Sequence, residues 1–158
     1  MRIDEYVFKE IVDTYSDTLF RVAYAYCGNK SDAEDVVQDT FVKYLKKQPE
    51  FETDEHAKAW FIRVAVNLCK DHLKSGFIKN RCELSENIPA YSSEDKAVWE
   101  SVGKLPAKYR IVIELFYHEG YSIKEISEIL HKNSSTVGNQ LARAKKLLEK
   151  ILREDMYE

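Results

Sequence analysis

The sequence predicts an all-α protein with two small helical domains joined by a linker: an N-terminal bundle of three to four helices and a C-terminal helix-turn-helix domain. Apolar residues recur at spacings of three and four along most of the 158 residues, and no segment alternates as a strand would. The spacing is lost between Gly76 and Ser93, where a proline and serines accumulate. We therefore expect domains at residues 1–76 and 94–153, with a linker at 77–93.

Three helices are expected in the N-terminal domain. The first spans about residues 4–26 and ends at Gly28 and Asn29. The second starts at a Ser-x-x-Glu capping box and spans 31–47, and the third spans about 55–75. Helices of this length form a compact bundle. The expected inward residues are Tyr6, Ile11, Tyr15, Leu19, Val22 and Tyr26, then Ala33, Val36, Val37, Thr40, Phe41 and Tyr44, then Ala57, Trp60, Phe61, Val64, Ala65, Leu68, Cys69 and His72.

The C-terminal domain begins with two helices that precede the helix-turn-helix. A short helix is expected to end near Gly103, after which Pro106 suits the first turn of the next helix. That helix carries an apolar face and ends at Glu119 and Gly120. Its expected inward residues are Ile111, Val112, Leu115 and Phe116.

Residues 121–148 have the pattern of a helix-turn-helix. Ser122 and Glu125 form a second capping box, and Asn133 or Ser134 can cap the following helix. The second helix of such a motif lies in the DNA major groove, where hydroxyl, amide and guanidinium groups reach bases and phosphates. The alternative is an ordinary helical hairpin with a solvated polar face. The candidate DNA-facing residues are Ser135, Thr136, Asn139, Gln140, Arg143 and Lys146, opposite the inward Val137, Leu141, Ala144, Leu148 and Ile151.

Gly138 lies inside this second helix and should cost it roughly 1 kcal/mol relative to alanine. It either permits a close approach of the backbone to DNA or is merely tolerated.

Two further helical faces are candidates for binding. In the third helix, polar residues at spacings of four, three and four align on one side and suit phosphates and a base edge, although a solvated face is the alternative. In the second helix, acidic and apolar residues are mixed, which suits either a protein-docking face or the helix dipole alone. The third-helix set is Arg63, Asn67, Lys70 and Lys74, and the second-helix set is Asp35, Val36, Gln38, Asp39 and Phe41.

The charge is distributed unevenly along a chain of net charge −3. Residues 56–82 carry six cations against Asp71, and residues 131–153 carry six against Glu149. Because phosphate neutralisation supplies most nonspecific DNA affinity, a slightly acidic chain with two basic patches is expected to bind DNA weakly alone and to gain affinity from a partner.

No pattern in the sequence indicates an enzyme. There is no glycine-rich phosphate loop and no nucleophile motif, and the four histidines lack metal-ligand spacing, so we expect neither a cofactor nor a metal. Cys27, Cys69 and Cys82 are scattered and are interpreted as reduced thiols. No apolar run approaches a membrane span and the N-terminus is not a signal peptide, so we expect a cytoplasmic protein without membrane insertion.

Three segments together resemble bacterial sigma factors. DAEDVVQDTFVKYLKK at 32–47 resembles their core-polymerase-binding helix, and HAKAWFIRVAVNLCKDHLK at 56–74 resembles their −10 recognition helix. LPAKYRIVIELFYHEGYSIKEISEIL with STVGNQLARAKKLLEKIL, at 105–130 and 135–152, resembles their −35-binding domain. Two such domains with a short linker are similar to the extracytoplasmic-function (ECF) group.

The resemblance implies a sigma factor that binds core RNA polymerase, through the β′ clamp and the β flap, and recognises the −10 and −35 promoter elements. Asp35, Gln38, Asp39 and Phe41 would lie at or near the clamp-docking surface. The stripe from Arg63 to Lys74 would face the −10 element, beside a loop at 48–54 that captures a flipped base. The second helix of the helix-turn-helix would face the −35 element, and an anti-sigma factor is expected as a further partner.

Two alternatives of other classes stay open at this point. One is an autonomous helix-turn-helix regulator, which would bind a palindromic site as a dimer. The net negative charge of the chain and the lack of an obvious dimerisation helix count against this class. The other is a helical adaptor that mimics a sigma factor and binds only proteins. The basic stripe of the third helix counts against this class.

Overall fold

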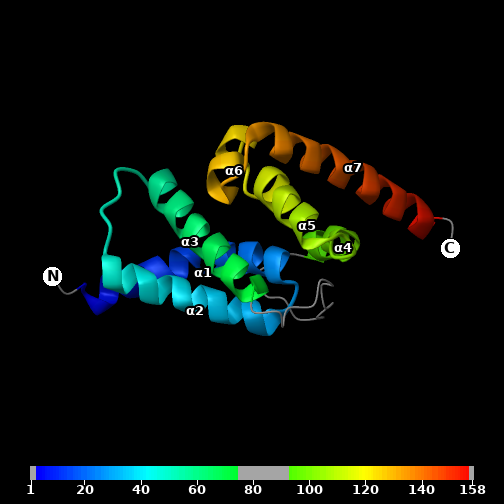
Figure 1. Ribbon diagram of the computed structural model, residues 1–158. Helices are drawn as coiled ribbons and strands as arrows, with labels where there is room; N and C mark the ends of the chain where they lie inside the picture. Colours follow the sequence, from blue (N-terminus) through cyan, green and yellow to red (C-terminus); the bar gives the residue numbers. More distant parts are fainter. Residues whose placement is uncertain (1–2, 75–92, 157–158) are drawn as a thin grey trace.

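The computed structural model describes residues 3–74 and 93–156 (Figure 1). Every regular element within these ranges is a helix, so the expected all-α fold is confirmed. None of the described helices combines the length and the apolar character that crossing a membrane requires. The predicted linker lies outside the described residues except for Ser93, which is the first residue of a helix.

The first bundle contains α1 (Glu5–Cys27), α2 (Lys30–Lys47) and α3 (Asp54–Lys74). The chain then continues, from Ser93, into a second group of helices that lies against α1 and α3 (Figure 1). This group contains α4 (Ser93–Val102), α5 (Ala107–Ile113), a π-helix η1 (Glu114–His118), α6 (Ile123–Leu130) and α7 (Ser134–Met156).

The junction between α1 and α2 differs in one respect from the expectation. Gly28 ends α1 in the left-handed region at φ 82°, as a glycine readily can. The cap of α2 is Asn29 and not the predicted Ser31, because Asn29 is extended and its Oδ1 accepts the backbone N–H of Asp32 at 2.8 Å. Ser31 is already inside the helix, so the sequence motif starting there does not form the cap.

Aromatic rings fill the centre of the first bundle. Phe61 is 1 % exposed and packs against Phe41 and Tyr44, with ring centroids 5.9 and 5.4 Å away. Tyr6 was expected to point inward but is 70 % exposed. Phe8 occupies the inward position instead, and its ring contacts Phe41. Residues two apart on a helix point about 200° apart, so an inward Phe8 leaves Tyr6 on the outside.

The second group contains one element that periodicity did not reveal. The helix after Pro106 was expected to continue as an α-helix to Glu119, but it widens into the π-helix η1, in which the Glu119 N–H donates to the Glu114 carbonyl at 3.0 Å. π-turns are typically single insertions inside α-helices and have no separate apolar period, so the pattern of apolar residues could not show this one.

The capping box at the start of α6 is confirmed in both directions. The Ser122 Oγ accepts the Glu125 N–H at 3.1 Å, and the Glu125 carboxylate accepts the Ser122 N–H at 3.0 Å. The turn that follows uses His131 in the left-handed region at φ 54°. Asn133 then accepts the Thr136 N–H at 2.8 Å at the start of α7, which confirms one of the two predicted caps.

Candidate polymerase and nucleic-acid interfaces

An open groove of about 530 Å³ separates the outer sides of α1 and α2. Phe20, Val37 and Phe41 supply apolar lining, while Asp35 and Gln38 supply polar lining. The groove thus has the mixed character of a protein-docking surface, with charged and polar groups around an apolar floor.

The residues predicted for polymerase binding divide into two sets in the structure. Asp35, Gln38 and Asp39 are exposed, and Phe41, though 7 % exposed, lines the groove. Val36 is different: its side chain is 0 % exposed and belongs to the core. Its place beside Asp35 suggested a surface role, but its burial confirms the inward position that its spacing also predicted, so we remove it from the candidate contact surface.

The predicted stripe on α3 lies outside the core. Arg63 and Lys74 are exposed, and Asn67 and Lys70 are partly exposed. Lys70 is engaged in a contact that the sequence did not reveal: its Nζ donates to the carbonyl oxygen of Leu130, at the end of α6, at 2.8 Å. Burial, and then the nearby charges of Lys132 and Lys74, lower the pKa of Lys70.

The loop before α3 places aromatic residues beside this stripe. Phe51 stacks on Tyr44 at 6.5 Å and lies 5.8 Å from Trp60, while the loop residues Glu52 and Thr53 are exposed. Both Trp60 and Phe61 were expected to point inward: Phe61 is core, whereas Trp60 is partly exposed at the edge of the cluster.

The outer face of α7 carries the predicted −35 residues. Val137, Leu141 and Ala144 are buried, as their spacing predicted. Of the six candidates, Ser135, Asn139, Arg143 and Lys146 are exposed, whereas Thr136 and Gln140 are partly buried. Within the described chain, Gln140 Oε1 is buried without a hydrogen-bond partner.

Gly138 lies in this face, and a Cβ added there would meet no atom within 4 Å. Packing in the structure therefore does not require a glycine at this position.

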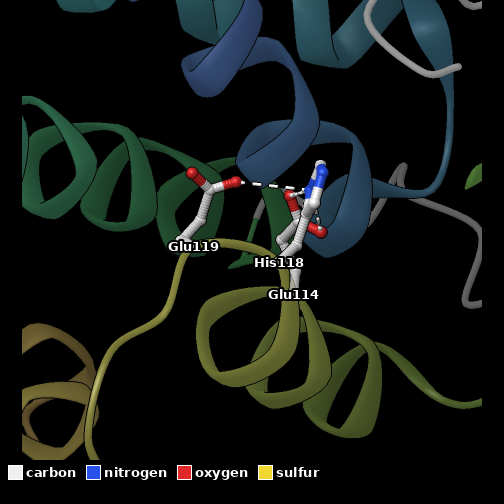
Figure 2. Close-up of side chains that lie close together, drawn as sticks. All are labelled: Glu114, His118 and Glu119. Atoms are coloured by element: carbon white, nitrogen blue, oxygen red, sulfur yellow. Dashed lines mark hydrogen bonds and ion pairs between the residues drawn. The ribbon is translucent and has the colours of Figure 1, made fainter.

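A group of charged side chains at the C-terminal end of η1 was missed by sequence reasoning (Figure 2). His118 Nδ1 lies 2.9 Å from Glu114 Oε1 and 3.4 Å from Glu119 Oε2. Two cations from the first bundle join them: Arg21 Nε is 3.4 Å from Glu119 Oε2, and Lys58 Nζ is 3.3 Å from Glu119 Oε1. We call these five residues the charge cluster.

The acid–base properties of the charge cluster follow from its burial. The Glu114 carboxylate is 2 % exposed, and burial raises its pKa to about 7, against the opposing effect of His118. The hydrogen bond to Glu114 raises the pKa of His118. The Glu114–His118 spacing was visible in the sequence, but Arg21 and Lys58 come from elements far away in the chain, so only the fold could bring them there.

The charge cluster is interpreted as an ion-pair network and not as a metal centre. Glu114, His118 and Glu119 could each offer one ligand atom, and these atoms lie within 4.8 Å of one another. However, two cations already lie within 3.4 Å of the Glu119 carboxylate, and a metal ion there would be repelled by both.

Cys27 and Cys69 are free thiols, each 0 % exposed, as expected for core cysteines. Cys82 lies outside the described residues.

Comparison with known proteins identifies both groups of helices. The model of sigma-70 region 2 matches residues 11–76, and the model of sigma-70 region 4 matches residues 95–148. The chain is 30 % identical to the ECF RNA polymerase sigma factor SigW of Bacillus subtilis, over 96 % of this chain and 91 % of SigW. It is also 30 % identical to the RNA polymerase sigma factor SigV of the same organism, over 92 % of this chain and 91 % of SigV.

Solved structures show the same fold. The sigma factor RpoE of Bartonella quintana, solved with the anti-sigma factor NepR, matches with a TM-score of 0.74 at 23 % identity, over 92 % of this chain and 96 % of that one. CnrH, solved with the cytosolic domain of CnrY, matches with a TM-score of 0.67 at 27 % identity, over 96 % and 91 %. Sigma factors direct RNA polymerase to promoters and are not themselves enzymes. With both sigma-70 regions in order and full-length relatives at this identity, the chain belongs to the extracytoplasmic-function RNA polymerase sigma factors of the sigma-70 family.

Proposed function

We propose that this chain performs sigma-factor function through three separate surfaces: the α1–α2 groove for core RNA polymerase, the α3 stripe for the −10 element and the outer face of α7 for the −35 element. The observation that carries the proposal is that an acidic–apolar groove and two polar or cationic helical faces lie in the matching family segments, in the expected order. Residues 1–76 and 94–153 are proposed as the two functional domains, with 77–93 linking them.

The groove suits the β′ clamp of the polymerase. Asp35 and Gln38 line the groove and are exposed, and Asp39 is exposed on the same helix, so all three can pair with cations and amides of a partner. Phe20 and Val37, which are both partly exposed, offer apolar area that a partner helix can cover.

The α3 stripe suits the melted −10 element. Arg63, Lys70 and Lys74 can neutralise phosphates, and the Asn67 amide can read a base edge. The loop at 48–54 holds Phe51 next to Trp60, 5.8 Å away, so an aromatic surface lies close to the position where an unstacked base would arrive.

The face of α7 suits duplex DNA at the −35 element. Ser135, Thr136 and Asn139 lie in its first turns, where a recognition helix contacts base edges, and Arg143 and Lys146 follow toward the phosphates. The second domain would also contact the β flap. An anti-sigma factor is proposed as a regulatory partner, because structures of related sigma factors were solved with such proteins.

Binding to purified bacterial core RNA polymerase tests the proposal directly. We expect one-to-one binding by the full chain, measured by fluorescence anisotropy, and a large loss for Asp35→Lys with Asp39→Lys, which reverses two exposed charges at the groove. Phe41→Ala would be a less suitable test, because Phe41 is core and its loss would destabilise the bundle.

Glu149→Lys with Glu154→Lys is the matched control, since it makes the same charge change at two exposed positions of α7, on a different element from the groove. It should bind core polymerase like the wild type. Absence of core binding, together with specific DNA binding by the free chain as a dimer, would overturn the proposal in favour of an autonomous regulator. Core binding without any effect of charge reversal at Lys70 and Lys74 on promoter melting would favour the adaptor class.

A further inference from the structure

A small pocket lies between α4 and the continuous stretch formed by α5 and η1. Its volume is about 150 Å³. Neighbouring turns of α4 supply one wall, and the end of α5 together with η1 supplies the other. None of the residues that line the pocket belongs to the three surfaces proposed above. The lining residues are Val98, Trp99 and Val102 of α4, Ile113 of α5, and Glu114, Tyr117 and His118 of η1.

The π-helix gathers the residues of the second wall on one side. The hydrogen bonds of a π-helix join residues five apart, so its wider turn keeps His118 on the same side as Ile113. In a regular α-helix, the fifth residue along the chain points about 140° away. The widened turn therefore gives the pocket a wall that is apolar at Ile113 and polar at His118.

The pocket is apolar and aromatic except at one end. Trp99, Val102 and Ile113 are buried, whereas Val98 and Tyr117 are 60 % and 56 % exposed and thus lie on the side that is open to solvent. An apolar cavity of roughly this volume in another protein holds a benzene ring. Aromatic rings also pack favourably against other aromatic rings, which Trp99 and Tyr117 supply. The size and the lining therefore suit one small aromatic ring system.

The polar end of the pocket is the Glu114 carboxylate, which accepts hydrogen bonds. Its oxygens lie 2.9 and 3.2 Å from His118 Nδ1, and Arg21 Nε lies 3.8 Å from Oε1 (Figure 2). A carboxylate has about four lone-pair positions, so it can accept more than His118 donates. Arg21 and Lys58 would repel a ligand cation, and Glu114 and Glu119 would repel an anion. The charges therefore favour a neutral ligand with an N–H or O–H group.

We propose that this pocket binds a small neutral aromatic molecule with one hydrogen-bond donor, its ring against Trp99 and Ile113 and its donor on the Glu114 carboxylate. Mostly apolar walls with a few convergent polar groups are typical of small-molecule sites. Burial raises the pKa of Glu114 to about 7, and groups with shifted pKa values are concentrated at such sites. The inference concerns the free chain, so it does not depend on the binding of polymerase or promoter DNA.

Indole and benzothiophene are matched probes for this site, because they have nearly the same shape and only indole carries an N–H donor. Both affinities are measured by nuclear magnetic resonance titration of the full chain at pH 8, where Glu114, with a pKa of about 7, is mostly ionised. We expect indole to bind with a Kd on the order of 0.3 mM. Nuclear Overhauser contacts should join indole to the methyl groups of Val102 and Ile113. No saturable binding of indole, or contacts to other methyl groups only, would overturn the site.

The role of Glu114 is tested by Glu114→Gln, which keeps the size of the side chain and removes its charge. The ratio of the two affinities cancels the different transfer of the probes from water. The preference for indole over benzothiophene should fall about tenfold, because a charge-assisted hydrogen bond becomes a neutral one. Glu149→Gln, at an exposed position of α7, should keep the wild-type ratio. An unchanged ratio in Glu114→Gln would overturn the donor contact.

Blocking the open side of the pocket gives a second test. Val98→Trp adds a large ring where the pocket meets solvent, so both probes should bind about tenfold more weakly or not at all. Val42→Trp makes the same substitution at an exposed position of α2 and should bind both probes like the wild type. Circular dichroism checks that both variants fold. Equal binding by the two variants would place the ligand elsewhere and refute the proposal.

Discussion

Replacing Glu114 with glutamine should change how the stability of the protein depends on pH. Burial raises the pKa of Glu114 from 4.5 to about 7, so the folded protein holds a proton on this group more tightly than the unfolded chain does. The contribution of Glu114 to stability is therefore fully present below pH 4.5 and is lost as the pH rises through about 7.

The difference between those two pKa values is about 2.5 units, which corresponds to about 3 kcal/mol at 1.36 kcal/mol per unit. Because only 2 % of the Glu114 side chain is exposed, solvent screening reduces this figure very little. The hydrogen bond with Glu114 also raises the pKa of His118, so loss of the His118 proton as the pH rises destabilises the fold in the same direction. Arg21 and Glu119 face the same site and remain in the variant.

The assay is urea unfolding followed by tryptophan fluorescence at pH 5, 6, 7 and 8. The free energy of unfolding of the wild type should fall across this range, and that of Glu114→Gln should fall less. The difference between the two proteins should approach 3 kcal/mol in favour of the variant at the alkaline end, reduced by the lost ion pair with Arg21. Glu149→Gln, at an exposed position, should follow the wild type. Parallel curves for the wild type and Glu114→Gln would refute the reasoning.

Three other substitutions test separate parts of the structure. Gly138→Ala should raise the free energy of unfolding by about 1 kcal/mol, since a Cβ there meets open space. If the holoenzyme with this variant binds the promoter more weakly, DNA approaches the backbone closely at this position. If binding is unchanged, the glycine is merely tolerated. Ser122→Ala should lower the free energy of unfolding by about 1 kcal/mol through loss of the capping box, measured against Ser135→Ala, and an unchanged midpoint would contradict the role of the cap. Lys74→Gln should reduce the slope of log binding constant against log salt concentration for promoter binding by about one unit, as expected for the loss of a phosphate contact. An unchanged slope would remove Lys74 from the DNA surface.

Periodicity and end signals predicted most of the helices because local physics decides those features. The Ser122–Glu125 capping box and the Asn133 cap form from residues three apart, and both are present. The Ser31 motif failed for an equally local reason: Asn29, next to the left-handed Gly28, offered a cap two residues earlier. The prediction that Tyr6 points inward was wrong because the inward stripe of α1 begins at Phe8.

The interface between the two groups of helices could not be predicted in this way. Arg110 and Glu114 are charged residues in an apolar helix, and their burial depends on partners in α1 about ninety residues away. The π-turn that follows α5 adds one residue to the register and brings Glu119 to the same side as Glu114. The surface positions of most candidates on α3 and α7, by contrast, could be predicted because each set lies on a single helix, whereas the groove needs both α1 and α2.

The uneven charge of the chain takes on a physical meaning where the two groups of helices meet. The packing of α6 on α3 brings Lys132 close enough to Lys70 for its charge to lower the pKa of Lys70, so like charges repel each other at this contact. The Glu119 carboxylate opposes this repulsion by pairing with Arg21 and Lys58 a short distance away.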